Sequence, residues 1–217
     1  MRTLLSNLKN SLFFLIPQGI FLVSAGIVLA IFSKSDIHLA INKQHSSFGD
    51  AIMPWVTWGG EGLTITVLVL LMFAWNRKFA LLTGISCLFA SGITQLLKNT
   101  FFSGEPRPKL FFSTPSPLHF VPGVENFLYD SFPSGHTTVA FAFYFCLVFA
   151  VKNNLLKLSL FVIALLVGYS RIYMSQHFLG DVFAGSIIGT TSTLLIFTIA
   201  INKGWLNLKN LSAQNEA

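Results

Sequence analysis

Six apolar segments constrain this chain more than any other feature of its sequence. The hydrocarbon core of a bilayer is about 30 Å thick, so a helix needs roughly 20 apolar residues to cross it. The segments span about 11–32, 60–75, 79–98, 135–151, 155–173 and 180–201, the second and fourth being short without flanking residues. The first exceeds a typical signal-peptide core, and no clear cleavage site follows it. We therefore predict an all-α, polytopic membrane protein with six transmembrane helices.

The composition is not that of a soluble protein. Charged residues make up 10% of the chain and hydrophobic residues 53%, whereas a soluble domain carries about 25% charged residues. The net charge of +6 is not gathered in a basic cluster, so nucleic-acid binding is not expected. Cys87 and Cys146 lie inside apolar segments, where thiols act as small apolar side chains, and we expect no disulfide and no metal there. With no internal repeat, residues 1–217 are predicted to form a single domain.

Lysine and arginine predict the orientation of the spans, because positive charges favour cytoplasmic loops. With a cytoplasmic N-terminus, the short turns NRKF and KNNLLK lie inside, and so do 8 of the 14 basic residues: Arg2, Lys9, Arg77, Lys78, Lys152, Lys157, Lys203 and Lys209. The four tryptophans fall at predicted span ends, as in an aromatic belt: Trp55, Trp58, Trp75 and Trp205. We predict that both termini are cytoplasmic.

The segment 99–134 is predicted to be a long outer loop. Its prolines forbid a regular span, and its aromatic residues indicate a place at the membrane surface: Pro106, Pro108, Pro115, Pro117, Pro122, Pro133, Phe101, Phe102, Phe111, Phe112 and Phe120. Loops of this length are usually functional or disordered. Outer-loop residues without an evident partner are expected to be solvated at the surface: His38, His45, His119, Glu125 and Asp130. Glu61 is expected to hydrate the membrane interface.

Six ionisable residues converge on the outer membrane surface under this topology: Lys98, Arg107, His136, Arg171, His177 and Asp181. Ionisable groups at membrane depth are costly and tend to be functional. Three permanent cations and two histidines indicate a pocket for a multiply charged anion. Phosphate fits best, because a guanidinium binds its oxygens in bidentate fashion.

The stretch DSFPSGHTT resembles the start of an anion-binding helix. Pro133 cannot continue a preceding helix, and Ser134 can cap the following one. Gly135 lets the backbone approach a ligand, and free N–H groups at a helix start favour an anion. His136 would then stand beside that anion as a proton donor or acceptor. A simple capped helix with an interfacial histidine explains the same residues equally well.

His177 and Asp181 would lie one turn apart if the helix began at His177. A carboxylate bonded to one ring nitrogen fixes the tautomer and directs the other nitrogen toward a substrate, which is the arrangement of an activated nucleophile. A structural His–Asp pair that joins two spans is the alternative reading.

Two motifs give the chain a specific resemblance. SRIYMSQHFLGD (170–181) matches S-R-x5-H-x3-D, and PSGH (133–136) matches a second signature. Together they resemble the type 2 phosphatidic acid phosphatase superfamily. The first motif of that family, K-x6-R-P, differs here because eight residues separate Lys98 from Arg107. A loop absorbs two extra residues at little entropic cost, although Lys109 is a weaker candidate for the same role.

The resemblance implies a role for each matching residue. Lys98, Arg107 and Arg171 would bind the phosphoryl oxygens, assisted by Ser134 and by the backbone of Gly135 and His136. His177 would attack phosphorus, oriented by Asp181, and His136 would protonate the leaving oxygen. The resemblance implies no metal and no other cofactor.

A bacterial inner-membrane enzyme with its active site at the periplasmic surface is the expectation that follows. Its partners would be the bilayer and a phosphorylated lipid: undecaprenyl pyrophosphate, a glycerophospholipid phosphate such as phosphatidic acid or phosphatidylglycerol phosphate, or a lipid A phosphate. No obligatory protein partner is evident. Phosphotransfer to a lipid acceptor would use identical residues and stays open. An anion or lipid transporter is disfavoured, because such sites tend to lie at the bilayer midplane between inverted repeats.

Overall fold

Helices account for all the regular structure in the described part of the computed structural model, which comprises residues 8–9, 11–112 and 117–206. The elements are α2 (Leu12–Ile31), α3 (Lys34–Asn42), α4 (Ser47–Val56), the 3-10 turn η1 (Thr57–Gly60), α5 (Gly62–Trp75), α6 (Arg77–Thr100), α7 (Pro108–Phe111), α8 (Gly135–Val148), α9 (Asn154–Tyr173) and α10 (Leu179–Asn202). Arg2, Pro115 and Lys209, which entered the sequence argument, lie outside the described residues.

The helices are those of a multi-pass membrane protein. In the described ranges α2, α6, α9 and α10 are each long and apolar enough to cross a bilayer. The second predicted segment forms the latter part of a pair, Ser47–Gly60 with Gly62–Trp75, which is bent by 52° and passes the same test as one broken span. The fourth, α8, is apolar but only 14 residues long. The prediction of an all-helical membrane protein is confirmed, and the sequence missed α3 and α4.

The short helix α8 is the centre of the bundle. Most of its side chains are buried, including Phe141, Phe143 and Phe145, and it packs against α6, α9 and α10. The contact with α10 is close because small residues face it: a Cβ on Gly185 would lie 2.8 Å from the Ser134 carbonyl oxygen. Such glycines let membrane helices approach backbone to backbone. The starts of α8 and α10 are thereby held together.

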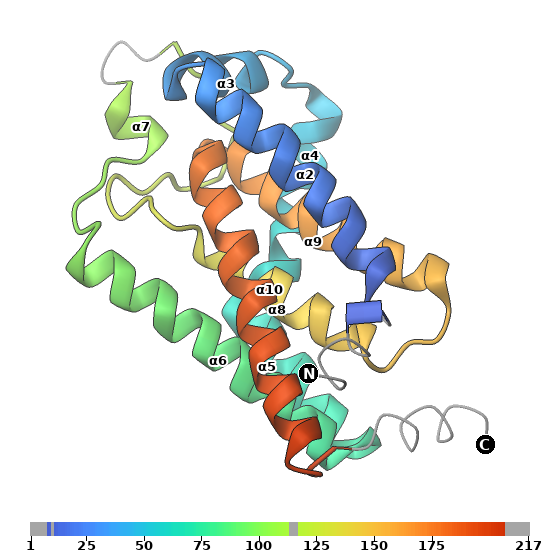
Figure 1. Ribbon diagram of the computed structural model, residues 1–217. Coiled ribbons are helices and arrows are strands. Elements are labelled where there is room, and N and C mark those ends of the chain that lie inside the picture. The colour runs from blue at the N-terminus through green and yellow to red at the C-terminus, as the bar shows by residue number, and fades with distance from the viewer. Residues whose placement is uncertain (1–7, 10, 113–116, 207–217) are drawn as a thin grey trace.

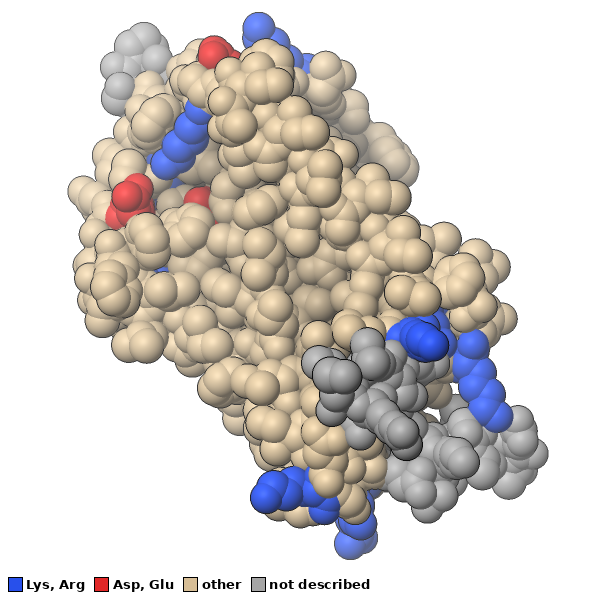
Figure 2. All heavy atoms as spheres, viewed as in Figure 1, with Lys and Arg blue, Asp and Glu red and all other residues tan. Residues whose placement is uncertain are grey.

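One end of the bundle carries the short elements. Figure 1 shows α3 and α7 at the end where α2 finishes and α10 begins. Figure 2 shows acidic side chains only toward this end, lysine and arginine toward both ends, and an uncharged surface between them. An uncharged band between two charged ends is the surface that a bilayer requires.

Candidate active site

His177 and Asp181 lie at the start of α10. His177 lies two residues before the helix rather than in its first turn, yet its Nδ1 lies 3.3 Å from Asp181 Oδ2. The same carboxylate oxygen accepts from the Phe178 N–H at 2.9 Å and from the Ser131 hydroxyl at 2.5 Å. An acceptor-only carboxylate requires the proton of His177 on Nδ1. The lone pair of the ring therefore lies on Nε2, on the opposite side from Asp181.

Arg107 faces that Nε2 atom. Its Nη1 lies 3.4 Å from His177 Nε2 and 3.2 Å from the Gln176 carbonyl oxygen. The outer loop carries Arg107 to this place by folding back on itself, with the Arg107 N–H donating to the Leu128 carbonyl at 2.8 Å. Its Nε donates to the Tyr129 carbonyl at 2.7 Å. The guanidinium is thus fixed next to the nitrogen that would attack a substrate.

Lys98 reaches the same place despite the eight-residue spacing. Helix α6 continues to Thr100, and the turn that follows takes up the extra residues. Lys98 Nζ donates to the Asp130 carbonyl at 2.7 Å, and Arg107 Nη2 donates to the same oxygen at 3.3 Å. Lys109 lies in α7 and is exposed, so the geometry favours Lys98 as the partner of Arg107.

Arg171 and His136 line a cavity of about 270 Å³. Arg171 lies in the last turn of α9 and is 7% exposed. It donates from Nη1 to the Thr57 hydroxyl oxygen at 2.9 Å, while its buried Nε has no partner among the described residues. Trp58 and Phe127 form part of the rim. A buried guanidinium nitrogen without a partner indicates a place for an anion, since an unpaired buried donor is costly.

The start of α8 supplies further donors. Ser134 caps the helix as predicted, and its Oγ accepts from the Thr137 N–H at 3.4 Å and from the Thr137 hydroxyl at 2.9 Å. The Ser134 N–H donates to the Asp181 carbonyl at 3.1 Å, which ties α8 to α10 beside His177. The N–H groups of Gly135 and His136 lie in the first turn, where the helix dipole favours an anion. The described residues contain no group of three or more metal-ligand side chains.

The family model for the PAP2 superfamily matches residues 79–205, more than half of the chain. The chain belongs to the PAP2 superfamily. This range contains every residue of the site described above except Thr57 and Trp58, so the resemblance inferred from the two motifs is confirmed.

Proteins named as phosphatases are among the relatives of this PAP2 protein. It is 29% identical over 161 residues to undecaprenyl-diphosphatase BcrC of Bacillus subtilis (71% of this chain, 77% of that protein). The crystal structure of Aquifex aeolicus LpxE matches with a TM-score of 0.68 and 25% identity over 78% of this chain and 98% of that one. The transmembrane PAP2 type phosphatidylglycerolphosphate phosphatase from Bacillus subtilis matches with a TM-score of 0.61 and 24% identity over 88% and 97%.

Three residues that the sequence argument did not single out contact the PAP2 motif residues. Ser131 donates to Asp181, Gln176 binds Arg107 and donates from Nε2 to Asn126 Oδ1 at 2.9 Å, and Thr57 binds Arg171. Gln176 lies inside the SRIYMSQHFLGD motif and Ser131 lies two residues before PSGH, and these positions are a usable signal. Thr57 has no such signal, because 114 residues separate it from Arg171.

His38 corrects another expectation. It is not a surface residue but is 1% exposed, and its Nε2 lies 3.1 Å from the hydroxyl of Ser175, two residues before His177. Its ring packs against Phe178 at 5.2 Å between centroids. His119, also expected without a partner, has its Nε2 2.8 Å from Asp50 Oδ2. Helix α3 therefore supports the loop that carries His177, and α4 contacts the outer loop through His119.

The buried histidines predict that acid destabilises the protein. Burial lowers the pKa of His38 to about 4 and that of His177 to about 3, the latter despite the opposing hydrogen bond to Asp181. In the unfolded chain these two histidines become protonated below about pH 6.5, whereas in the folded state they stay neutral. Each histidine then costs about 1.4 kcal/mol of stability per pH unit until its folded pKa is reached.

We expect the melting temperature in detergent to fall from pH 7 to pH 5. The decrease should be smaller in His38→Gln, which keeps a polar group near Ser175 but cannot titrate. Equal decreases in both proteins would show that His38 does not carry this dependence.

Proposed function

We propose that this PAP2 protein hydrolyses a phosphate or diphosphate group of a membrane lipid through a phosphohistidine at His177. The observation that carries the proposal is the position of the His177 ring between Asp181 on Nδ1 and Arg107 on Nε2. One ring nitrogen is fixed by a carboxylate, and the other faces a cation that would attract a phosphoryl oxygen. The pKa of His177, lowered by burial, keeps the free imidazole neutral and able to attack at neutral pH.

In the first step, His177 Nε2 forms a bond to phosphorus as the bond from phosphorus to the lipid oxygen breaks. His136 gives a proton to that leaving oxygen, and Asp181 stabilises the positive charge that develops on the His177 ring. In the second step, water attacks the phosphohistidine, and His136 takes a proton from it. The products are inorganic phosphate and a lipid with one phosphate fewer, and His177 is regenerated.

In the transition state, negative charge is spread over the equatorial oxygens of the transferring phosphoryl group. Side-chain cations of the site would stabilise this charge. Lys98, Arg107 and Arg171 would neutralise that charge. The Ser134 hydroxyl and the N–H groups of Gly135 and His136 would add hydrogen bonds from the start of α8. Donors fixed before the reaction stabilise the transition state without reorganisation.

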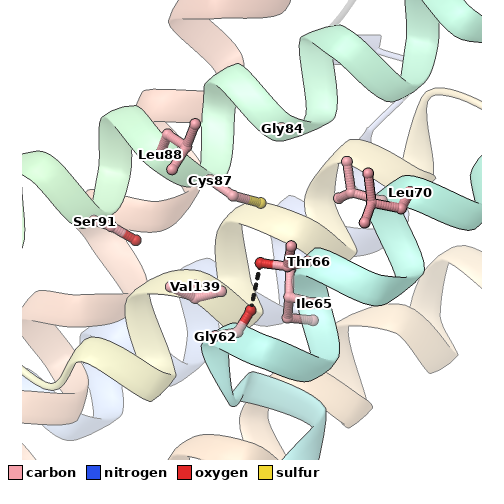
Figure 3. A pocket seen from close by; sticks show the side chains of 10 residues that line it. Gly62, Ile65, Thr66, Leu70, Gly84, Cys87, Leu88, Ser91 and Val139 are labelled. Carbon is pink, nitrogen blue, oxygen red and sulfur yellow. Dashed lines mark hydrogen bonds between the residues drawn. The ribbon is translucent and has the colours of Figure 1, made fainter. Parts of the chain in front are cut away.

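A groove in the membrane-embedded part supports a lipid substrate. About 250 Å³ of space lies between α5 and α6, lined by Ile65, Val69, Leu70 and Leu88 among others. Figure 3 shows these two helices with Cys87 directed between them, and Val139 of α8 beside the start of α5. Val139 is one helical turn from His136. An apolar chain in this groove would place its phosphate near the cations.

Undecaprenyl diphosphate is the first candidate substrate, because BcrC of Bacillus subtilis is named for that lipid and covers most of the chain. The positions of Lys and Arg and of the four tryptophans support an active site on the periplasmic side of a bacterial inner membrane, with six spans and both termini in the cytoplasm.

Phosphate release from a lipid panel tests the function. Detergent-purified protein should release phosphate from at least one of undecaprenyl diphosphate, phosphatidic acid, phosphatidylglycerol phosphate and lipid A. Because side chains supply the cations, EDTA should leave the rate unchanged. Orthovanadate should inhibit, because it adopts the five-coordinate geometry of the transferring phosphoryl group.

Each other outcome of the panel is informative. The ranking of the lipids identifies the substrate class. Loss of activity in EDTA would contradict the metal-independent mechanism. Turnover of the lipid only when a lipid acceptor is present would identify a phosphotransferase. No turnover with or without an acceptor would contradict the proposal that this site is enzymatic.

A further inference from the structure

The 3-10 turn η1, which lies outside the two sequence motifs, forms part of the wall of the cavity. Its first residue, Thr57, lines the cavity together with His136 and Arg171. The Thr57 hydroxyl oxygen accepts the 2.9 Å hydrogen bond from Arg171 Nη1. η1 lies at the bend between α4 and α5, outside the range matched by the family model.

The turn is held rigidly against α8 and α9. A Cβ on Gly60 would lie 2.5 Å from the His136 carbonyl oxygen and 2.6 Å from a methyl carbon of Val167. A Cβ on Gly59 would lie 2.9 Å from the Tyr144 hydroxyl. Only glycine permits such close packing, and Glu61 fixes the exit of the turn by accepting from the Leu63 N–H at 2.6 Å. Thr57 thus lies on a turn that packs directly against the backbone of His136.

Arg171 has to be held in one orientation to bind a phosphoryl group. A guanidinium is a planar fork that binds two oxygens along one edge, and an arginine side chain carries about 2 kcal/mol of rotamer entropy. The Thr57 oxygen holds Nη1, whereas the buried Nε has no partner among the described residues. Fixing Nη1 leaves the edge that contains Nε for the anion.

We propose that Thr57 is a positioning residue that orients the Arg171 guanidinium for phosphoryl binding. The proposal rests on the proposed phosphatase function but uses a residue outside both motifs. It identifies the bend between α4 and α5 as part of the active-site framework. The hydroxyl oxygen is the group that matters, because it is the acceptor for Nη1.

Substitutions at Thr57 separate this role from a structural one. Thr57→Val keeps the shape and removes the acceptor, and Thr57→Ser keeps the acceptor. Losing a hydrogen bond to a charged group should lower kcat/KM for the best lipid about 10- to 100-fold in Thr57→Val and raise the inhibition constant of orthovanadate by a similar factor. Thr57→Ser should retain nearly full activity. The control is Thr191→Val, because Thr191 is exposed and bonds only to carbonyls of its own helix.

A double-mutant cycle decides whether Thr57 acts through Arg171. In an Arg171→Ala background, Thr57→Val should have no further effect. An equal loss in both backgrounds would overturn the proposal, as would wild-type kcat/KM in Thr57→Val. If Thr57→Val does not fold, as judged by its melting temperature, Thr57→Ala takes its place in the cycle.

Vanadate binding, measured as a rise in melting temperature, separates this inference from the function itself. A wild-type protein that hydrolyses no lipid, yet binds vanadate in a manner that depends on Thr57, would reject the phosphatase and keep the positioning role. If the wild-type protein hydrolyses lipid but Thr57→Val binds vanadate equally well, the phosphatase function stands and the positioning role of Thr57 is rejected.

Discussion

Replacing His177 with alanine should abolish turnover, with a loss of at least about 10⁴-fold in kcat, because no other described side chain is held between a carboxylate and a cation. The ring is 2% exposed, with hydrogen-bonding groups on both nitrogens. Removing it leaves a cavity but not an unpaired charge on Asp181, which keeps its bonds from Ser131 and Phe178. The variant should therefore still fold and be extractable in detergent.

The covalent intermediate gives this prediction a second measurement. Wild-type protein quenched during turnover of a ³²P-labelled lipid should carry acid-labile label, and His177→Ala should carry none. His45→Ala is the matched control, because His45 is exposed and stacks on His119 at 4.0 Å between ring centroids, outside the cavity. Retained turnover or retained label in His177→Ala would remove the nucleophile from the mechanism.

Replacing His136 with glutamine should lower kcat about 10²- to 10⁴-fold on a phosphomonoester such as phosphatidic acid, which is the usual range for a lost general acid. The leaving group of a monoester is an alkoxide, which needs a proton as it departs. The leaving group of a lipid diphosphate is itself a phosphate anion and needs none. The loss on undecaprenyl diphosphate should therefore be smaller.

The labelled intermediate again makes the test specific. With the diphosphate, attack on phosphorus should proceed in His136→Gln while hydrolysis of the phosphohistidine slows, so label should accumulate above the wild-type level. Equal losses on both lipids, without accumulation, would show that His136 does not act as the acid. The melting temperature should change little, because the His136 side chain is only partly buried.

The sequence predicted the helices and the motif residues well because both signals are local. Apolar segments of span length predicted α2, α6, α9 and α10, and the residue types around Ser134 predicted the start of α8. The distance between Lys98 and Arg107 could not be judged from spacing alone. It depends on where α6 ends and on the Asp130 carbonyl that both side chains bind.

The remaining contacts depend on tertiary structure that no local pattern encodes. His38 was expected at the surface because it falls in an outer loop without an evident partner, but packing against Phe178 buries it. The bond from Arg171 to Thr57 joins residues far apart in the chain. Ser131 resembles any loop serine until its hydroxyl is seen on Asp181.

If α8 crosses the bilayer, its length sets the depth of the proposed active site. At 1.5 Å per residue its 14 residues rise about 21 Å, roughly 9 Å less than the thickness of a bilayer core. With the far end of α8 at one face of the hydrocarbon, the end that carries His136 would lie in a recess below the opposite headgroups. A lipid would have to sink by about that distance for its phosphate to react. Lipids with a flexible apolar chain would do so at lower cost than lipids anchored by bulky headgroups.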